Sequence, residues 1–186
     1  MYEKFGQFID GKWQKSSDEG TYEVINPANE EVLGKASKAT TQDVERALKS
    51  AAKGLEVWKK TPPWQRSYII RRIADKMREK EDVLAKWMTL EVGKPFAEAK
   101  GEVNGAADIF EWNAEETKRI YGQTVESRFE DTRVHVYYQP VGVVAALVPW
   151  NFPVILASRK ISTALAAGCS VIVKPDVICL LYTSPS

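Results

Sequence analysis

The sequence has few of the side chains that build disulfide frameworks or metal sites. Its 186 residues contain two cysteines, Cys169 and Cys179, and one histidine, His135. Two cysteines do not make a disulfide framework or a metal-binding cluster, so we expect no metal and thiols that stay reduced. We interpret Cys169 as a small core residue at the start of a buried strand, and His135 as a surface residue on an edge strand.

A surplus of charge of either sign is also missing. The chain has 26 Lys and Arg residues against 25 Asp and Glu residues, which gives a formal net charge of +1. Nucleic-acid binding needs a basic excess, so nucleic acid is excluded as the main partner. No apolar run reaches the roughly 18 residues of a membrane helix, and the opening MYEKFGQFIDGKW lacks the apolar core of a signal peptide. We therefore expect a cytoplasmic protein with no membrane partner.

The first part of the chain predicts short strands followed by helices. Residues 6–15 alternate around Asp10-Gly11, a pattern typical of a hairpin. Extended segments follow and break at Asn26-Pro27. A helical period begins at Thr41, with Thr40 and Asp43 spaced like a capping box. Three more helices are predicted, one starting near Pro63, one over about 82–91 that stops at Gly93, and one over about 95–119.

The last of these helices is amphipathic, and we expect its apolar side to face the core. That side carries Val103, Ala106, Ala107, Phe110 and Ala114. We interpret Gly101 and Gly105 as positions where another helix packs closely. The acidic residues Glu111, Glu115 and Glu116 are typical of a solvated helix face, and the tryptophans Trp58, Trp87 and Trp112 are expected to serve packing.

The second part of the chain predicts a βαβ unit. Residues 132–138 alternate as a half-exposed antiparallel strand, whereas residues 142–148 are apolar on both faces, as in a central parallel strand. A helix is predicted from Pro153 to a cap at Gly168, followed by the second apolar strand, CSVIVKP. Strand, helix and strand within about 35 residues form a right-handed crossover.

Ligands of open α/β sheets bind beyond the carboxyl ends of the strands. The segment PWNFP follows the first strand there, and Lys174-Pro175 follows the second. The Asn151 amide is suited to donate to an oxygen that gains negative charge during a reaction. Asparagine is also a preferred helix N-cap, so a purely structural role stays open. The glycine fingerprint of dinucleotide-binding domains is absent.

Several segments carry a family resemblance. VPWNFP followed by ALAAGCSVIVKP, preceded in order by FIDGKW, INPANEEVLG, LEVGKPFAEAKGEV and EWNAEETKRIYG, resembles the aldehyde dehydrogenase superfamily over residues 1–175. The resemblance implies a modified Rossmann domain without the glycine fingerprint, NAD or NADP as cofactor, and oxidation of an aldehyde through a cysteine thiolate. It also implies a homo-oligomer.

The resemblance assigns roles to individual residues. Asn151 matches the asparagine that donates its amide to the thiohemiacetal oxygen, and Phe152 is expected to line the aldehyde pocket. Lys174 matches the lysine that binds the adenosine ribose or helps to hold a 2′-phosphate. The positions that lie along the cofactor are Leu147, Val148, Pro149 and Trp150.

Arg159 narrows the expected substrate. An arginine–lysine pair at this distance from WNFP resembles succinate-semialdehyde dehydrogenases, whose arginine meets the substrate carboxylate. A guanidinium matches a carboxylate with two parallel hydrogen bonds and keeps its charge. Alternatively, Arg159 is an exposed helix residue or forms a salt bridge between subunits. The alternative substrates are betaine aldehyde and aliphatic aldehydes.

The expected fold is α/β, with a partial modified Rossmann domain, an antiparallel oligomerisation arm and an incomplete sheet. Residues 1–122 form the N-terminal hairpin and helices of the cofactor domain, 123–140 the arm, 141–175 the βαβ unit and 176–186 an aberrant tail. In the tail, Val177 stands where the family has a ribose-binding glutamate. The nucleophilic cysteine and the general-base glutamate are missing, so we expect an inactive fragment. A non-catalytic module that binds a dinucleotide or a full-length subunit is the alternative.

Overall fold

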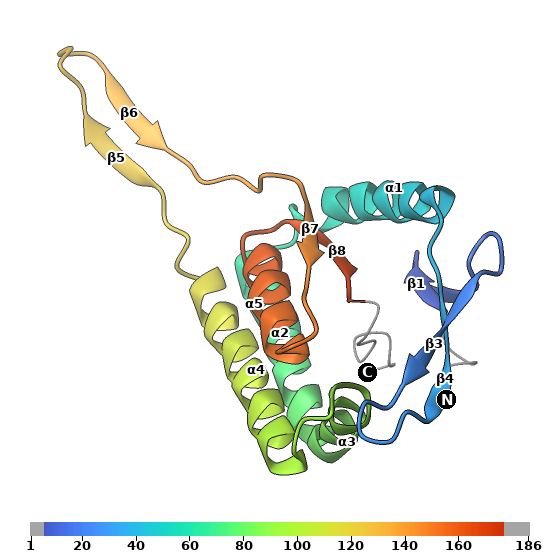
Figure 1. The fold of residues 1–186 in the computed structure, drawn as a ribbon. Helices are drawn as coiled ribbons and strands as arrows, with labels where there is room; N and C mark the ends of the chain where they lie inside the picture. Colours follow the sequence, from blue (N-terminus) through green and yellow to red (C-terminus); the bar gives the residue numbers. More distant parts are fainter. Residues whose placement is uncertain (1–5, 177–186) are drawn as a thin grey trace.

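The structure is a computed structural model that describes residues 6–176 (Figure 1). Strands β1 (Gln7–Ile9) and β2 (Lys12–Gln14) form the predicted hairpin, and Asp10 and Gly11 turn the chain with φ values of 56° and 73°. Two left-handed residues in succession match the twist of the flanking strands. Strands β3 (Thr21–Ile25) and β4 (Val32–Ser37) form a second antiparallel pair, with the expected break at Asn26-Pro27.

Helix α1 (Thr41–Trp58) begins at the predicted capping box. The buried carboxylate of Asp43 caps the helix and also accepts hydrogen bonds from outside it. The Thr40 backbone N–H donates to it over 2.9 Å, and Ser17 N–H, Ser16 Oγ and Gln7 Nε2 each donate over 3.2 Å. Arg46 pairs with the same carboxylate. Asp43 therefore joins the N-terminal hairpin, the segment after it and α1.

Four helices build the main core. They are α2 (Pro63–Glu79), α3 (Glu81–Val92), α4 (Phe96–Thr117) and α5 (Pro153–Ala166). Helix α4 packs against the other three, and Figure 1 shows it beside α2 and α5. The five residues of its predicted inner side are all buried, as expected, and pack with Ile70, Ala74 and Met88.

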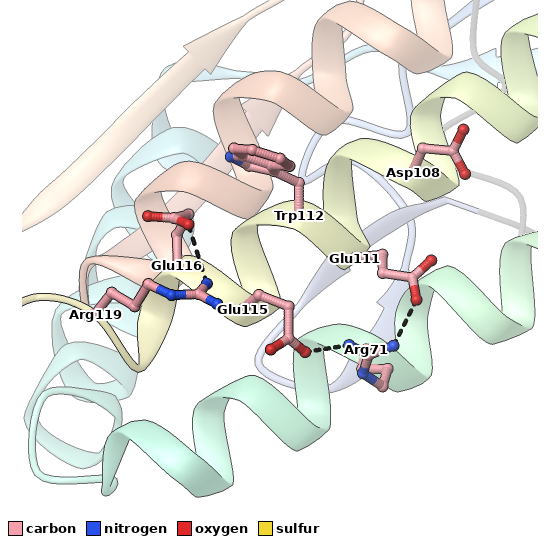
Figure 2. A pocket seen from close by; sticks show the side chains of 7 residues that line it. All are labelled: Arg71, Asp108, Glu111, Trp112, Glu115, Glu116 and Arg119. Carbon is pink, nitrogen blue, oxygen red and sulfur yellow. Dashed lines mark hydrogen bonds and ion pairs between the residues drawn. The ribbon is translucent and has the colours of Figure 1, made fainter.

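Three expectations for α4 need correction. Trp112 is 68% exposed, whereas Trp58 and Trp87 do pack against buried clusters. Glu111 and Glu115 do not form a freely solvated face, because both pair with Arg71 on α2 (Figure 2). An added Cβ at Gly105 would lie 3.4 Å from Ile155 Cδ1, which confirms close packing there, but Gly101 has no atom within 4 Å of that position.

Strands β5 (Gln123–Glu126) and β6 (Arg133–Val136) form an antiparallel hairpin that projects away from the helices (Figure 1). The alternating pattern predicted one covered face for this second strand. All residues of both strands are instead exposed, so neither face is covered by the described part of the chain. His135 lies on β6, exposed as predicted, with its Nδ1 3.2 Å from Thr124 Oγ1.

Strands β7 (Val143–Leu147) and β8 (Ser170–Lys174) are parallel and are joined by α5. Helices α1 and α5 both contact this pair. The apolar pattern predicted that both faces of β7 are buried, but only Ala146 is fully buried and Leu147 is 64% exposed. Within residues 6–176, β7 pairs with β8 alone, so the sheet is incomplete as expected. Cys169 is buried at the start of β8, also as expected.

Two glycines allow a matched test of the packing. Gly168 has φ of 86°, and an added Cβ would lie 2.9 Å from Pro140 Cγ and 3.2 Å from Arg66 Nη1. We expect Gly168→Ala to lower the free energy of unfolding by about 2–4 kcal/mol, through backbone strain and overpacking. Gly101→Ala, at an exposed position in the middle of α4, should raise the free energy of unfolding by about 0.5–1 kcal/mol. Urea unfolding of both variants checks this, and shifts of the same sign would contradict it.

Candidate active site

The carboxyl ends of β7 and β8 bring together residues that are distant in sequence. Leu147 pairs with Lys174 in the parallel register, and the Val148 N–H donates to the Lys174 carbonyl over 3.2 Å. Pro149 and Trp150 then lead from this sheet edge towards α5. The predicted cofactor residues are therefore neighbours at one end of the sheet, where ligands of open α/β domains bind.

The surface at this edge is apolar and exposed. Leu147, Trp150 and Phe152 are 64%, 47% and 50% exposed. Lys174, which pairs with Leu147, is exposed as well. Exposed apolar groups next to a cation suit a dinucleotide, which offers flat rings and sugars together with hydroxyl or phosphate groups.

The turn at Asn151 decides between the two readings of that residue. The N-cap of α5 is Phe152, with φ of −135° and no capping hydrogen bond from its own side chain. The first free N–H groups of the helix, those of Val154 and Ile155, instead donate to Glu102 Oε1 over 3.0 and 3.2 Å. The capping role for Asn151 is therefore wrong. Its side chain is exposed and makes no hydrogen bond to residues 6–176.

Lys94 and Glu102 contact the same turn and were missed by the sequence analysis. Both side chains are almost fully buried, 10% and 3% exposed, and they form an ion pair. Lys94 Nζ also donates to the Asn151 carbonyl over 3.3 Å and lies 3.9 Å from the centre of the Phe152 ring. One signal could have found Glu102: it lies on the apolar stripe of α4, between Ala99 and Ala106 at helical spacing.

Arg159 lies on the second turn of α5 and is exposed. No carboxylate of the described residues pairs with it, whereas Arg71 and Arg78 are each paired with acidic residues of α4. A guanidinium left unpaired within these residues is available to a ligand carboxylate or to a second subunit, and both alternatives for Arg159 stay open.

A hollow of about 440 Å³ lies elsewhere, on the outer side of α4 (Figure 2). Its lining includes Arg71, Glu111, Glu115 and Trp112. The charges there are satisfied by one another: hydrogen bonds from Arg78 and Arg71 lower the pKa of the Glu111 carboxyl, and Arg71 Nη1 lies 2.5 Å from its Oε1. These carboxylates are held by internal partners, so the hollow is not the candidate site. No group of His, Cys, Asp and Glu residues suited to a metal ion occurs within residues 6–176.

The sequence and the fold were compared with those of known proteins. The profile of the aldehyde dehydrogenase family matches residues 13–181, which is most of the chain. This chain belongs to the aldehyde dehydrogenase family. The match runs past Pro175 to residue 181, and the predictions for Val177 and for the rest of the tail lie outside the described residues.

Two of the similar curated proteins are semialdehyde dehydrogenases. The chain is 46% identical over 168 residues to glutarate-semialdehyde dehydrogenase of Pseudomonas putida, a match that covers 90% of this chain and 35% of that protein. It is 44% identical over 167 residues to the NADP(+) succinate-semialdehyde dehydrogenase GabD of Escherichia coli K12, with the same two coverages. The chain thus spans about a third of the length of these relatives.

A solved structure supports the same fold. A betaine aldehyde dehydrogenase variant from Staphylococcus aureus, in complex with NAD+, superposes with a TM-score of 0.89 and 37% identity, over 91% of this chain and 35% of that one. The α/β fold class and the family resemblance are therefore confirmed. No helix of residues 6–176 has the length and apolarity needed to cross a membrane.

Proposed function

We propose that this chain supplies the N-terminal third of an NAD(P)-dependent dehydrogenase that oxidises a carboxylated semialdehyde, such as succinate semialdehyde, to the acid. The single observation that carries the proposal is the Asn151 turn. It presents an exposed side-chain amide, free of hydrogen bonds to residues 6–176, just beyond the carboxyl end of β7, the strand whose last residue pairs with Lys174.

In the proposed mechanism Asn151 contributes the oxyanion donor. When a thiolate adds to the aldehyde carbon, the carbonyl oxygen becomes an alkoxide, and the Asn151 side-chain N–H donates a hydrogen bond to it. Phe152 lines the aldehyde pocket and keeps water from the reacting carbon. A bound NAD or NADP would supply the acceptor for the hydride that the tetrahedral carbon loses after thiolate addition.

Residues at the sheet edge fit that dinucleotide. Leu147, Pro149 and Trp150 provide an exposed apolar surface along it, whereas the Val148 side chain is buried at 5% exposure beneath this edge, and Lys174 provides a cation for the adenosine ribose or a 2′-phosphate. The chemistry of these groups suits NAD and NADP alike. One named relative is described with NADP(+) and one structural neighbour with NAD+.

The proposed division of the chain follows the sequence. Residues 1–122 and 141–175 belong to the cofactor domain, residues 123–140 form an arm that joins subunits into a homo-oligomer, and residues 176–186 are a tail. We propose that the chain alone does not turn over aldehyde. Within residues 6–176 the one free cysteine is Cys169, and it is buried inside the domain rather than at the Asn151 turn.

The proposal is tested in a completed enzyme. Residues 1–175 are joined to the remaining part of Escherichia coli GabD, and the formation of NADPH or NADH is followed with succinate semialdehyde. We expect substrate-dependent reduction of the dinucleotide. A soluble, oligomeric chimera that binds the dinucleotide but reduces none of it would contradict the proposed function.

Arg159→Ala in this chimera tests the substrate class. We expect kcat/KM for succinate semialdehyde to fall by about 10- to 100-fold, since hydrogen bonds to a charged group contribute about 1.5–3 kcal/mol. For butanal, which has no carboxylate, the change should stay within about threefold. The control is Lys160→Ala, which removes the neighbouring exposed cation of α5. Equal losses for the two substrates would exclude the carboxylate role.

A further inference from the structure

We propose that Lys94 and Glu102 are positioning residues that hold the Asn151 turn in its catalytic conformation. The inference rests on the proposed function, because it assigns the pair to the donor that the reaction uses. Its geometric basis is independent of that function. The side chains of Lys94 and Glu102 are buried and hydrogen-bond to the backbone of the turn, and Lys94 also lies over the Phe152 ring.

Glu102 fixes the start of α5. Pro153 is the first residue of the helix and has no N–H, so the first donors are those of Val154 and Ile155. Both point to one oxygen of the Glu102 carboxylate. A negative charge at a helix N-terminus is favoured by the helix dipole and by these unpaired donors. The carboxylate therefore sets where α5 begins relative to α4.

Lys94 fixes the residues just before the helix. Its ammonium pairs with the other oxygen of Glu102, donates to the Asn151 carbonyl and lies over the Phe152 ring. It follows Gly93, whose φ of 75° ends α3. Together the two side chains hold the turn from Asn151 to Ile155, and they leave the Asn151 side-chain amide unoccupied.

Stability alone is a weak reason for this arrangement. Burying two charges removes them from water, and apolar residues of similar volume often serve a fold as well or better. Around Glu102 the core consists of small apolar residues, including Ala99, Val103 and Val154. An ion pair differs from such a core because its hydrogen bonds have direction. A displacement of about 1 Å at a reacting group can cost about 100-fold in rate, so a directional clamp matters for Asn151.

The test uses Lys94→Met and Glu102→Gln, with Lys94→Arg as the conservative variant. The matched control is Lys100→Met. Lys100 lies on α4, as Glu102 does, and pairs with Glu81 and Asp82. Its ammonium lies 5.9 Å from the centre of the Phe96 ring, but it does not contact the Asn151 turn.

The first measurement is amide hydrogen exchange in the 186-residue chain. We expect the N–H groups of Val154 and Ile155 to exchange about tenfold faster in Lys94→Met and Glu102→Gln, and at the original rate in the control. This result does not depend on any enzymatic activity. Unchanged exchange at both amides in both variants would overturn the proposal.

The second measurement is steady-state kinetics of the same variants in the chimera with GabD. We expect Lys94→Met to lower kcat by about 10- to 100-fold with KM within about threefold, and Lys94→Arg to restore most of kcat. Faster exchange with an unchanged kcat would mean a purely structural pair and would overturn the proposal. An unsubstituted chimera that reduces no dinucleotide would instead overturn the proposed function. Faster amide exchange at Val154 and Ile155 would still show that Lys94 and Glu102 hold the turn.

Discussion

Replacing Asn151 by alanine is expected to lower kcat of the completed enzyme by about 10²- to 10³-fold. Removing one donor from an oxyanion site has an effect of this size, because the developing charge loses a hydrogen bond in a water-poor environment. KM for the aldehyde should change little, since the interaction strengthens only in the transition state. Steady-state kinetics of the chimera with succinate semialdehyde measure both constants.

Asn151→Asp is the sharper companion variant. It keeps the size of the side chain but replaces the donor with a carboxylate that repels the alkoxide, so we expect kcat at or below that of Asn151→Ala. Neither variant should alter the melting temperature greatly, because Asn151 is exposed and does not cap α5. An Asn151→Ala enzyme with the original kcat would show that the oxyanion is stabilised elsewhere.

Asp43→Ala is expected to cost about 3–5 kcal/mol of unfolding free energy, the range for breaking a buried charged network. The substitution leaves the N–H groups of Thr40 and Ser17 without their acceptor and the Arg46 guanidinium without its carboxylate partner. It also removes the hydrogen bond from Gln7 of β1 to α1, although Arg46 still donates to Gln14 of β2. Glu45→Ala, which removes an exposed carboxylate from the same helix turn, should change stability by less than about 0.5 kcal/mol. Urea unfolding compares the two.

The same carboxylate gives stability a defined pH dependence. Burial alone would raise the pKa of Asp43, but hydrogen bonds from the Thr40 backbone, Arg46, Gln7 and Ser17 outweigh it and hold that pKa well below its usual range. Because the folded-state pKa is the lower one, the contribution is complete above the unfolded-state value of about 3.9 and is lost as the pH falls below it. The unfolding free energy of Asp43→Ala should therefore fall less steeply with decreasing pH than that of the unsubstituted protein. Equal slopes for these two proteins at acid pH would contradict this assignment.

Local signals in the sequence predicted the elements well. The Thr40–Asp43 box, Pro63 at the start of α2, Gly93 at the end of α3 and the Asp10-Gly11 turn each act within a few residues, so the pattern alone contains the cause. The placement of Leu147 beside Lys174 also followed from the sequence, because parallel strands have their carboxyl ends at one edge.

Other features depended on partners that the local pattern does not contain. The hydrogen bonds from α5 to Glu102 span 52 and 53 residues, and that of Lys94 to Asn151 spans 57, so spacing could not reveal them. Trp112, Glu111 and Glu115 lie on the same helix, and the pairing of the two carboxylates with Arg71 depends on the position of α2. The exposed side of β7 has the same origin, because an apolar strand does not specify which neighbours cover it.

The contact of α1 with β7 and β8 has a consequence for biosynthesis. The ribosome releases the helix at residues 41–58 long before it makes the strands that the helix touches, which end at residue 174. Until then that helix has no β7–β8 pair to pack against. Closing so long a loop is slow, and nascent chains with uncovered apolar surface are the ones that chaperones engage. We therefore expect chaperones to hold the nascent chain until β8 emerges.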